Sequence, residues 1–521
     1  MNTKRIIMSI CFLTSLMSFS SCKDDILSEI TTLEVARAFS PTGLAAVVVN
    51  KTGVKLTWLA VNNPDSYTIE IYETADFSGS PVKTVSNIPF KQVPYTVTGF
   101  AGQTTYFARV KAVGAGVDDS KWVTATFNTD PEQIFQTVST ATLLAKEVTL
   151  SWPAGEIASS IVLTPGNITH TVTSAEIAAG QATLTGLAAE TDYVATLLKG
   201  TKTRGTATFT TLLDLGKATA VNPGDNLSAL LLNATEGQVF ALFPGSYTVN
   251  ADVIISKSIS IKGVKPYDKP IINGMVLRLK SNAGLELKDL ILDGTGSVAN
   301  YTILYDAVSG SSAFAPLIVQ KCEVKNYAKG IMSVGLATLI ESVTYSKNLI
   351  HDFECNGADF IDFRNGIAKT FLFENNTVYN CASSTTTGAR DLFRMDAGGS
   401  TNFSTITSMI TIKTNTFNNA SNLAAKRFLY IRLVRNSIDF SKNIVANTAG
   451  FFAVTASIIT TSASNNYFNA PLFTATPASG TKNDTGTSTS LDPGFTGAAT
   501  GNFTISNGTL KSNGIGDPRW R

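Results

Sequence analysis

Three segments in the second half of the chain place an arginine beside apolar residues at alternating positions. They cover residues 360–364, 391–396 and 429–433. Side chains alternate between the two faces of a β-strand, so burial of the apolar set would turn the arginines outward. The apolar set is Ile361, Phe363, Phe393, Met395, Ile431 and Leu433, and the arginines are Arg364, Arg394 and Arg432.

These arginines are 30 and 38 residues apart, which suggests equivalent positions on successive turns of a repeating fold. Stacked strands lie about 4.8 Å apart. Guanidinium groups in one column at that spacing repel one another unless an anion lies between or across them. The pattern therefore predicts an arginine column that requires negative charge.

Two sources of that negative charge remain open. Asp362, Asp391 and Asp396 could form a surface salt-bridge network with the column. Alternatively, the column could bind a polyanionic ligand, because guanidinium pairs with carboxylate through two parallel hydrogen bonds. Residues 357–435 hold nine Lys or Arg against five Asp or Glu, an excess that favours a ligand. The predicted ligand-binding residues are Asp362, Arg364, Arg394, Asp396, Lys426, Arg427, Tyr430 and Arg432.

Recurring asparagines predict the stacked fold that would position these residues. Asn348, Asn376, Asn415, Asn443 and Asn466 lie 28, 39, 28 and 23 residues apart. That spacing suits one coil of a parallel β-helix, with loops in the longer intervals. Stacked asparagines can hydrogen-bond from coil to coil, and asparagine tolerates the left-handed backbone of a tight bend. We interpret these asparagines as structural.

The first half of the chain alternates in short strands separated by turns. Trp58 lies on an early predicted strand and Tyr106 begins a late one, and the pattern recurs with Trp152 and Tyr193. A Trp and a Tyr in these places resemble the fibronectin type III fold with its tyrosine corner. Such domains most often serve as spacers, and no chemistry is expected of them.

The N-terminus is typical of an export signal. Lys4 and Arg5 precede apolar residues 6–19 and a pair of serines before Cys22, a pattern too short to span a bilayer. The region resembles the lipobox of bacterial lipoproteins, which implies that Cys22 is acylated and becomes the new N-terminus. Residues 23–25 resemble the acidic tag that directs Bacteroidota lipoproteins to the outer face of the outer membrane.

Composition argues against several classes of function. Removal of the two leader cations from the 41 basic residues leaves 39 against 39 acidic residues, so no long-range field would attract nucleic acid. The two histidines, His170 and His351, are far apart, which argues against a His-rich zinc site. Beyond the leader, Cys322, Cys355 and Cys381 form an odd set and are expected to be small buried residues rather than disulfides.

After residue 215 the segments 243–249, 253–263 and 285–294 resemble the opening turns of pectate-lyase-like and pectin-esterase-like β-helices. Residues 491–495 and 514–520 resemble the ends of Bacteroidota β-helix lipoproteins that accompany glycan uptake. The predicted fold class is all-β, with two fibronectin type III-like sandwiches followed by a right-handed parallel β-helix. The predicted boundaries are 1–22 for the signal peptide, 23–37 for a linker, 38–130 and 131–212 for the sandwiches, and 213–521 for the β-helix.

The resemblance implies binding of an extended acidic polysaccharide along one sheet of the β-helix. Lyases of this shape remove the proton next to a uronate carboxylate with an Arg or Lys base, helped by Ca²⁺ held on aspartates. The corresponding candidate bases are Arg364, Arg394 and Lys426, and the candidate calcium ligands are Asp359, Asp362 and Asp396.

We therefore expect a lipid-anchored protein of the outer-membrane surface that captures an acidic, pectin-like polysaccharide. Its expected partner is a glycan-uptake transporter complex, with no role for nucleic acid. A calcium-assisted polysaccharide lyase is the alternative. A structural or protein-docking lipoprotein with internally neutralised arginines is the third hypothesis.

Overall fold

The computed structural model describes residues 36–59, 65–298, 300–310, 312–383 and 388–521. The predicted signal peptide, Cys22 and most of the predicted linker lie outside these residues. None of the helices in the described part is long and apolar enough to cross a membrane. Two compact units, each considered separately, are Met1–Thr137 with Ser151–Gln181 and Val194–Ala207, and Val138–Leu150 with Ala182–Tyr193 and Thr208–Arg521.

The first sandwich has a three-stranded sheet, β1-β2-β5, and a four-stranded sheet, β4-β3-β6-β7. Trp58 lies in its core, as predicted, with a ring 5.1 Å from that of Tyr67. The backbone N–H of Ala101 donates to the hydroxyl of Tyr106 at 3.1 Å, which is the predicted tyrosine corner. The strands are β1 (Thr42–Val49), β2 (Gly53–Leu59), β3 (Ser66–Tyr72), β4 (Lys83–Ile88), β5 (Tyr95–Val97), β6 (Thr105–Val113) and β7 (Val123–Asn128).

The strands of the second sandwich form a four-stranded sheet, β10-β9-β12-β13, and a two-stranded sheet, β11-β8. Trp152 is buried, and the N–H of Ala188 donates to the hydroxyl of Tyr193 at 3.0 Å. Both sandwiches are therefore fibronectin type III-like, as predicted. The elements are β8 (Glu147–Ser151), β9 (Ser160–Thr164), β10 (Ile168–Thr171), α2 (Ser174–Ala179), β11 (Gln181–Thr185), β12 (Asp192–Lys199) and β13 (Lys202–Thr210).

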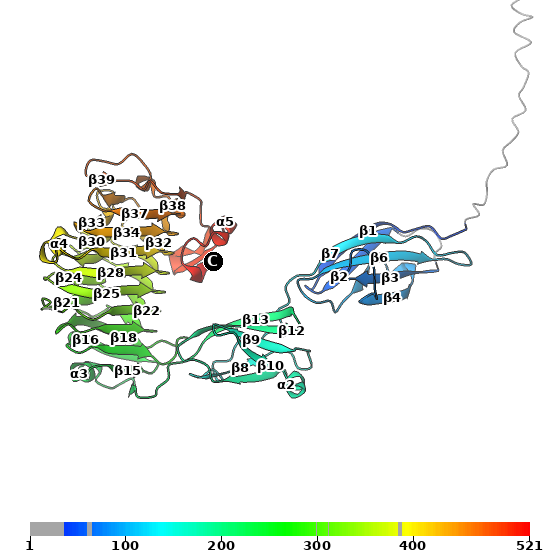
Figure 1. Cartoon of the computed structure of the whole chain (residues 1–521), viewed down its shortest axis with the longest axis horizontal. Coiled ribbons are helices and arrows are strands. Elements are labelled where there is room, and N and C mark those ends of the chain that lie inside the picture. Colours follow the sequence, from blue (N-terminus) through cyan, green and yellow to red (C-terminus); the bar gives the residue numbers. More distant parts are fainter. Residues whose placement is uncertain (1–35, 60–64, 299, 311, 384–387) are drawn as a thin grey trace, which may run out of the picture. The chain divides into compact units, whose positions relative to one another are not determined.

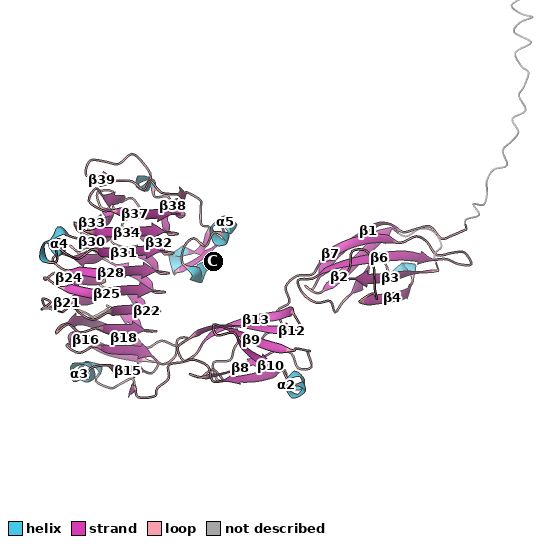
Figure 2. Ribbon diagram, viewed as in Figure 1, coloured by secondary structure: helices cyan, strands magenta, loops and turns pink. Residues whose placement is uncertain are grey.

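From β14 onward the chain forms the predicted parallel β-helix, whose coils stack in sequence order (Figure 1). Strands dominate and the helices are short (Figure 2). One ten-stranded parallel sheet forms the first face of the β-helix. It consists of β14 (Thr219–Val221), β15 (Gln238–Leu242), β17 (Ile259–Gly263), β19 (Leu285–Lys288), β22 (Leu317–Gln320), β25 (Leu339–Ser346), β28 (Ile367–Glu374), β31 (Ser408–Lys413), β34 (Asn436–Ser441) and β37 (Ile459–Ala463).

A seventeen-stranded sheet supplies the other two faces, which both begin at the long strands β16 (Ser246–Ile255) and β18 (Ile271–Leu279). The second face continues with β20 (Ile291–Asp293), β23 (Glu323–Lys325), β26 (Leu349–Phe353), β29 (Thr377–Cys381), β32 (Thr416–Ala420), β35 (Ile444–Ala446), β38 (Asn465–Phe468) and β40 (Ser488–Thr489). The third face continues with β21 (Ile303–Tyr305), β24 (Met332–Val334), β27 (Ile361–Phe363), β30 (Phe393–Met395), β33 (Arg427–Ile431), β36 (Phe451–Val454) and the antiparallel β39 (Thr481–Lys482).

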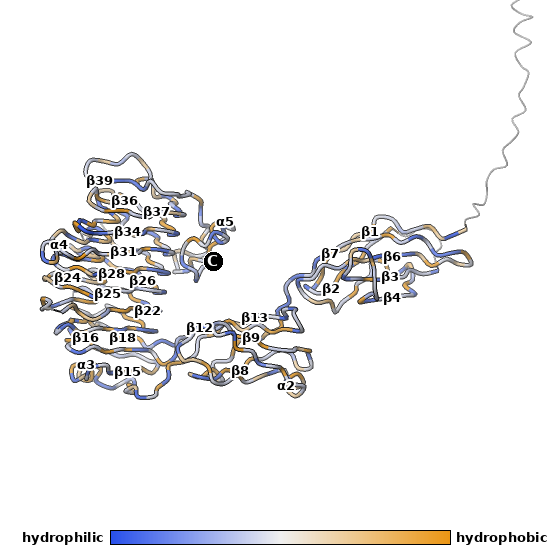
Figure 3. The backbone as a smooth tube through the Cα atoms, viewed as in Figure 1, coloured by the Kyte–Doolittle hydropathy of each residue, from blue (hydrophilic) through white to orange (hydrophobic). Residues whose placement is uncertain are grey.

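The interior of the β-helix is filled by apolar side chains from all three faces. Figure 3 shows hydrophobic and hydrophilic residues alternating along the coils, the pattern expected of strands with one buried side. Aromatic rings pack closely here, and those of Phe417 and Phe428 lie 4.9 Å apart. Cys322, Cys355 and Cys381 are buried and unpaired, as predicted.

Short elements complete the β-helix. Helices α3 (Leu227–Leu232) and α4 (Ala397–Asn402) precede strands β15 and β31 in the chain. The C-terminal segment contains β41 (Phe495–Gly497), β42 (Asn502–Ile505) and α5 (Gly508–Ser512), and it packs Ile505, Leu510 and Ile515 against the second face at β35. The one-turn 3₁₀ helices are Phe90–Gln92, Pro471–Phe473, Ala498–Thr500 and Pro518–Trp520.

A ladder of buried asparagines joins the coils where the first face turns into the second. The Oδ1 atom of Asn376 accepts from the backbone N–H of Asn348 at 2.9 Å, and that of Asn415 accepts from the N–H of Asn376 at 2.9 Å. Asn443 continues the ladder in the same way. Each amide N–H₂ also donates to a backbone carbonyl, so the corner leaves little hydrogen-bonding capacity unused.

Two details of this ladder differ from prediction. Its last member is Asn465, whose Oδ1 accepts from the N–H of Asn443 at 3.0 Å, and not Asn466. Asn466 instead accepts from the N–H of Leu491 and anchors the following segment. The left-handed backbone also falls one residue before each ladder asparagine, for example at Asn375 with φ 56°. The asparagines are therefore selected for their amides rather than for a left-handed conformation.

Replacing Asn415 by alanine should weaken the β-helix strongly. The change removes the acceptor of the buried N–H of Asn376 and one donor to the carbonyl of Phe373. We expect a loss of about 2–4 kcal/mol in the free energy of unfolding, measured by urea denaturation. The exposed Asn356 provides the matched control, and Asn356→Ala should change stability by less than about 0.5 kcal/mol. Equal losses in both variants would refute the structural role of the ladder.

Candidate functional site

The predicted arginine segments lie on the third face, on strands β27, β30 and β33 and the residues that follow them. The predicted alternation is confirmed, because Ile361, Phe363, Phe393, Met395, Ile431 and Leu433 are all buried. Arg364, Arg394 and Arg432 keep part of their side chains exposed. The sequence pattern thus placed these arginines on the outer side of the β-helix.

The predicted single column of arginines is wrong. In the sheet, Arg394 pairs with Asp362 on one side and with Tyr430 on the other. Met395 pairs with Phe363 and Ile431, so the next residue, Asp396, lies between Arg364 and Arg432. Opposite charges on adjacent strands attract and like charges repel, which favours this alternating register.

Direct ion pairs hold the arginines in place. Arg364 donates from Nε to Asp362 at 2.5 Å and from Nη2 to Asp359 at 2.6 Å. Arg394 donates from Nε and Nη2 to one oxygen of Asp396 at 2.9 and 2.8 Å. The prediction of an internal salt-bridge network is confirmed for these pairs.

The network continues onto the next coil. Arg427 Nη2 lies 2.9 Å from Asp391, and Arg432 Nε lies 3.2 Å from Asp396. We call the whole set the charged cluster. It consists of Asp359, Asp362, Arg364, Asp391, Arg394, Asp396, Arg427, Tyr430 and Arg432.

Tyr430 lies among three guanidinium groups. The central carbons of Arg427, Arg394 and Arg432 are 4.4, 4.7 and 5.2 Å from the centre of its ring. Such contacts attract a cation to the electron-rich face of the ring. Tyr430 was among the predicted ligand-binding residues, and in the structure its ring contacts these three arginines.

Asp396 is shared by more cations than it can neutralise. Besides Arg394 and Arg432, Arg364 Nη1 lies 3.7 Å from its carboxylate. Lys426, Arg390 and Arg435 flank the charged cluster, and none of them has a carboxylate within ion-pair distance in the part of the chain that the structure describes. The third face therefore keeps an excess of positive charge around an ordered network.

Asp359 is the most unusual acid of the charged cluster. Its side chain is 0% exposed, and its Oδ1 accepts from the N–H of Asp391 at 2.8 Å. Burial, and then the neighbouring charge of Asp362, raise the pKa of Asp359 to about 6, although Arg394 and Arg364 oppose the rise. This carboxyl group therefore titrates close to neutral pH.

The geometry does not favour Arg364 as a catalytic base. Burial lowers the pKa of Arg364, but its bond to Asp362 and the charges of Asp362, Asp359 and Asp396 outweigh that effect and raise it. A base must lose its proton readily near neutral pH. The candidate Arg394 lies on the adjacent strand β30 and is committed to Asp396. The candidate Lys426 precedes β33, whereas Arg364 follows β27, so these two candidates lie at opposite ends of the face.

The three candidate calcium ligands do not form a calcium site. Within the described ranges no group of three or more His, Cys, Asp or Glu side chains could hold a metal ion. Asp359, Asp362 and Asp396 each face arginine instead. Calcium needs several oxygen ligands free of competing cations, so these residues do not fit it.

The sequence did not point to Tyr301. Its hydroxyl donates to Oδ2 of Asp362 at 2.8 Å, from two coils away on the third face. Burial, and then the charge of Asp362, raise the pKa of Tyr301, so the phenol stays protonated and supports the carboxylate. No spacing in the sequence connects these two residues.

Two family models match the β-helix. They are a domain of unknown function (DUF4957), matched over residues 245–381, and a second domain of unknown function (DUF5123), matched over residues 410–520. No curated protein matches the chain.

Solved structures resemble the chain in two parts. A two-domain fibronectin type III segment from chicken tenascin is 19% identical, covers 33% of this chain and 97% of its own, and has a TM-score of 0.24. The central fibronectin III array of RIM-binding protein is 19% identical over 34% of this chain and 70% of its own, with a TM-score of 0.15. A mutant of a PL6-family alginate lyase is 16% identical over 53% of this chain and 39% of its own, with a TM-score of 0.36.

Substitution Asp359→Asn should change the pH dependence of stability. The pKa of this carboxyl rises from an ordinary 3.8 to about 6 on folding, so the native state binds the proton more tightly. Stability then falls as pH rises from about 4 to about 6. Relative to the original protein, the variant should gain on the order of 3 kcal/mol between pH 4 and pH 7. Urea denaturation of both proteins at the two pH values measures this, and a pH-independent difference would contradict the raised pKa.

Proposed function

We propose that this protein binds an acidic polysaccharide on the third face of its β-helix. The observation that carries the proposal is the local balance of charge. Four arginines of the charged cluster face four aspartates, and the additional cations Lys426, Arg390 and Arg435 flank them. An anionic chain that crosses the coils would meet this excess.

The ion pairs support binding because they fix the arginines before a ligand arrives. Arg432 bonds to Asp396 through Nε only, and 43% of its side chain is exposed. Its terminal N–H groups remain able to donate to a carboxylate. Little side-chain freedom is lost when an already ordered arginine binds, which lowers the cost of association.

The repeating architecture suits an extended ligand rather than a compact one. Parallel strands of the third face recur about every 4.8 Å. Carboxylates repeated along a polysaccharide could therefore contact several coils in succession. Because basic and acidic residues balance in the mature chain, this local excess is the main electrostatic feature available to a polyanion.

We further propose that the protein is anchored at the cell surface. Acylated Cys22 would anchor the protein at the outer-membrane surface, and the fibronectin type III-like sandwiches would act as spacers. A glycan-uptake complex would receive the captured polysaccharide. These elements rest on the sequence pattern of the leader, with its Lys4, Arg5 and Cys22.

The decisive experiment uses the mature chain without its lipid anchor, with polygalacturonate and other uronate polymers. Affinity electrophoresis at low and high salt measures binding. The triple variant Lys426→Gln, Arg432→Gln, Arg435→Gln should weaken binding at least tenfold and reduce its salt dependence, because exposed cations are lost.

A charge-matched control uses cations that lie off the third face. Lys257→Gln, Lys413→Gln and Lys511→Gln remove the same charge and should leave affinity unchanged. If both triple variants weaken binding equally, the effect comes from net charge alone, and the third face is not the binding site. Appearance of unsaturated, ultraviolet-absorbing products would instead identify a lyase.

A further inference from the structure

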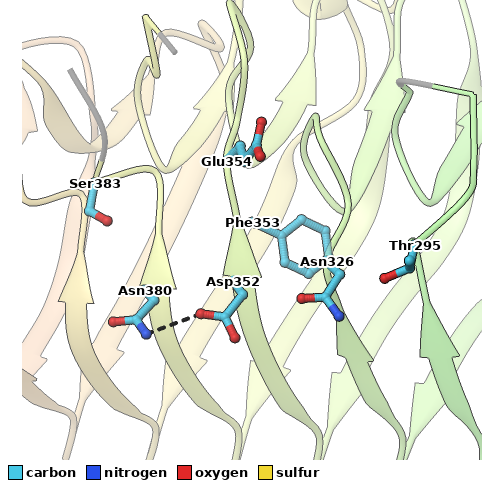
Figure 4. A pocket seen from close by; sticks show the side chains of 7 residues that line it. All are labelled: Thr295, Asn326, Asp352, Phe353, Glu354, Asn380 and Ser383. Atoms are coloured by element: carbon cyan, nitrogen blue, oxygen red, sulfur yellow. Dashed lines mark hydrogen bonds between the residues drawn. The ribbon is translucent and has the colours of Figure 1, made fainter. Parts of the chain in front are cut away.

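A second polar site lies where the second face of the β-helix turns toward the third. A cavity of about 510 Å³ opens there, and it shares no residue with the charged cluster. Figure 4 shows Thr295, Asn326, Asp352 and Asn380 side by side along its edge. Thr295 and Asn326 follow strands β20 and β23, and Asp352 and Asn380 lie near the ends of β26 and β29, so the four residues come from successive coils.

The backbone at this corner is in the left-handed region. Asn326, Asp352 and Asn380 have φ values of 61, 55 and 54°. Asparagine and aspartate are the residues other than glycine that adopt this conformation most readily. The corner therefore explains why short polar side chains recur here and point in the same direction on each coil.

These side chains form a ladder of their own, which we call the corner ladder. Asn326 donates to Asp293 at 3.0 Å, Asn380 donates to Asp352 at 3.1 Å, and Asn419 donates to Asn380 at 3.0 Å. Among the described residues, no hydrogen bond joins Asn326 to Asp352. The corner ladder is thus interrupted at the cavity, and polar atoms on both sides of the break face it.

His351 fixes the position of the Asp352 carboxylate. Its Oδ2 lies 2.7 Å from Nδ1 of His351, whose ring stacks on Tyr379 with centroids 4.6 Å apart. The other ring nitrogen of His351 lies 3.4 Å from Glu323. Asp352 therefore has a fixed geometry before a ligand enters, as a recognition site requires.

The chemistry of the lining selects the class of ligand. It contains hydroxyl, amide and carboxylate groups and no lysine or arginine, so an anion has no counter-charge there. The volume falls in the range of small-molecule sites, about 300–1,000 Å³, and exceeds what one metal ion needs. Adjacent amide and carboxylate groups can accept from, and donate to, neighbouring hydroxyls.

We propose that this cavity binds a neutral sugar unit of a glycan through its hydroxyl groups. Asp352 accepts from one hydroxyl, while Asn326 and Asn380 each exchange hydrogen bonds with its neighbours. Phe353 also borders the cavity, but its ring is buried in the core, so the polar groups make the contacts with the sugar. The site is separate from the acidic-polysaccharide face and does not depend on that function.

The test uses the mature chain with free glucose, galactose, mannose, xylose, arabinose and rhamnose, and with galacturonate as the acidic counterpart. Saturation-transfer NMR detects contact and isothermal calorimetry measures affinity. At least one neutral sugar should bind in the millimolar range, and galacturonate should bind more weakly than its neutral counterpart, galactose.

A matched pair of variants locates the site. Asn380→Gly removes a lining amide and keeps the left-handed backbone, and it should weaken sugar binding about tenfold. Asn447 has φ 55° and occupies the same kind of position in the corner ladder outside the cavity, where it donates to Asn418 and accepts from Asn469. Asn447→Gly should therefore leave sugar binding unchanged.

Several outcomes would overturn the proposal. They are absence of binding by every neutral sugar, equal loss in the Asn380→Gly and Asn447→Gly variants, and preference for galacturonate. Calcium binding that depends on Asp352 without any sugar binding would also overturn it. If Asn380→Gly lowers the melting temperature, Asn326→Gly on the other side of the break provides the same test. Retained binding of uronate polymers by these variants separates this site from the third face.

Discussion

The hydrogen bond that passes from one buried asparagine to the next is the interaction on which the β-helix depends. Where the first face turns into the second, the backbone N–H groups of five successive coils, at Cys322, Asn348, Asn376, Asn415 and Asn443, each point at the next coil. Oδ1 of the next asparagine accepts from each N–H, as Asn415 does for Asn376. A buried N–H without a partner is costly, so the recurring asparagines stabilise the corner in this part of the β-helix. These bonds tie each of these coils to the next at one corner, beside the last residues of the first-face strands.

The same stacking imposes a rule on charged side chains. Residues at equivalent positions on neighbouring coils lie so close together that like charges there repel one another strongly. The third face meets this constraint by register, with Arg394 beside Asp362 and with Asp396 between Arg364 and Arg432. Tyr430 adds an aromatic ring where a further carboxylate would otherwise be needed. The outcome is an ordered surface with a modest positive excess rather than a row of free arginines.

An ordered surface of this kind is better suited to recognition than to proton abstraction. The pKa of Arg364 is raised, which is the opposite of what a catalytic base requires. The aspartates that could have held calcium are engaged by arginine. The corner ladder shows a different use of the same stacking, since its break at Asn326 and Asp352 creates polar atoms directed into a cavity. The repeated coils thus form the scaffold, and the places where the repeated side-chain pattern changes are the candidate sites.

The sequence alone determined the fold class, the burial of the apolar residues and four of the five ladder asparagines. Each of these depends on residue type and local alternation, which are visible along the chain. An asparagine or aspartate four residues after each ladder position, such as Asn380 after Asn376, was also a visible signal for the corner ladder. It was missed because it marks a bend rather than a strand.

Only the tertiary structure decided the partners of the charged residues. Intervals of 30 and 38 residues between arginines do not specify register, because loops of different length separate the strands. A shift of two residues exchanges an arginine for an aspartate at the same position on the face, as at Arg394 and Asp396. The contact of Tyr301 with Asp362 spans two coils and leaves no local trace in the sequence. Side-chain pairing across coils depends on how the coils stack, and the spacing of residues along the sequence does not determine that stacking.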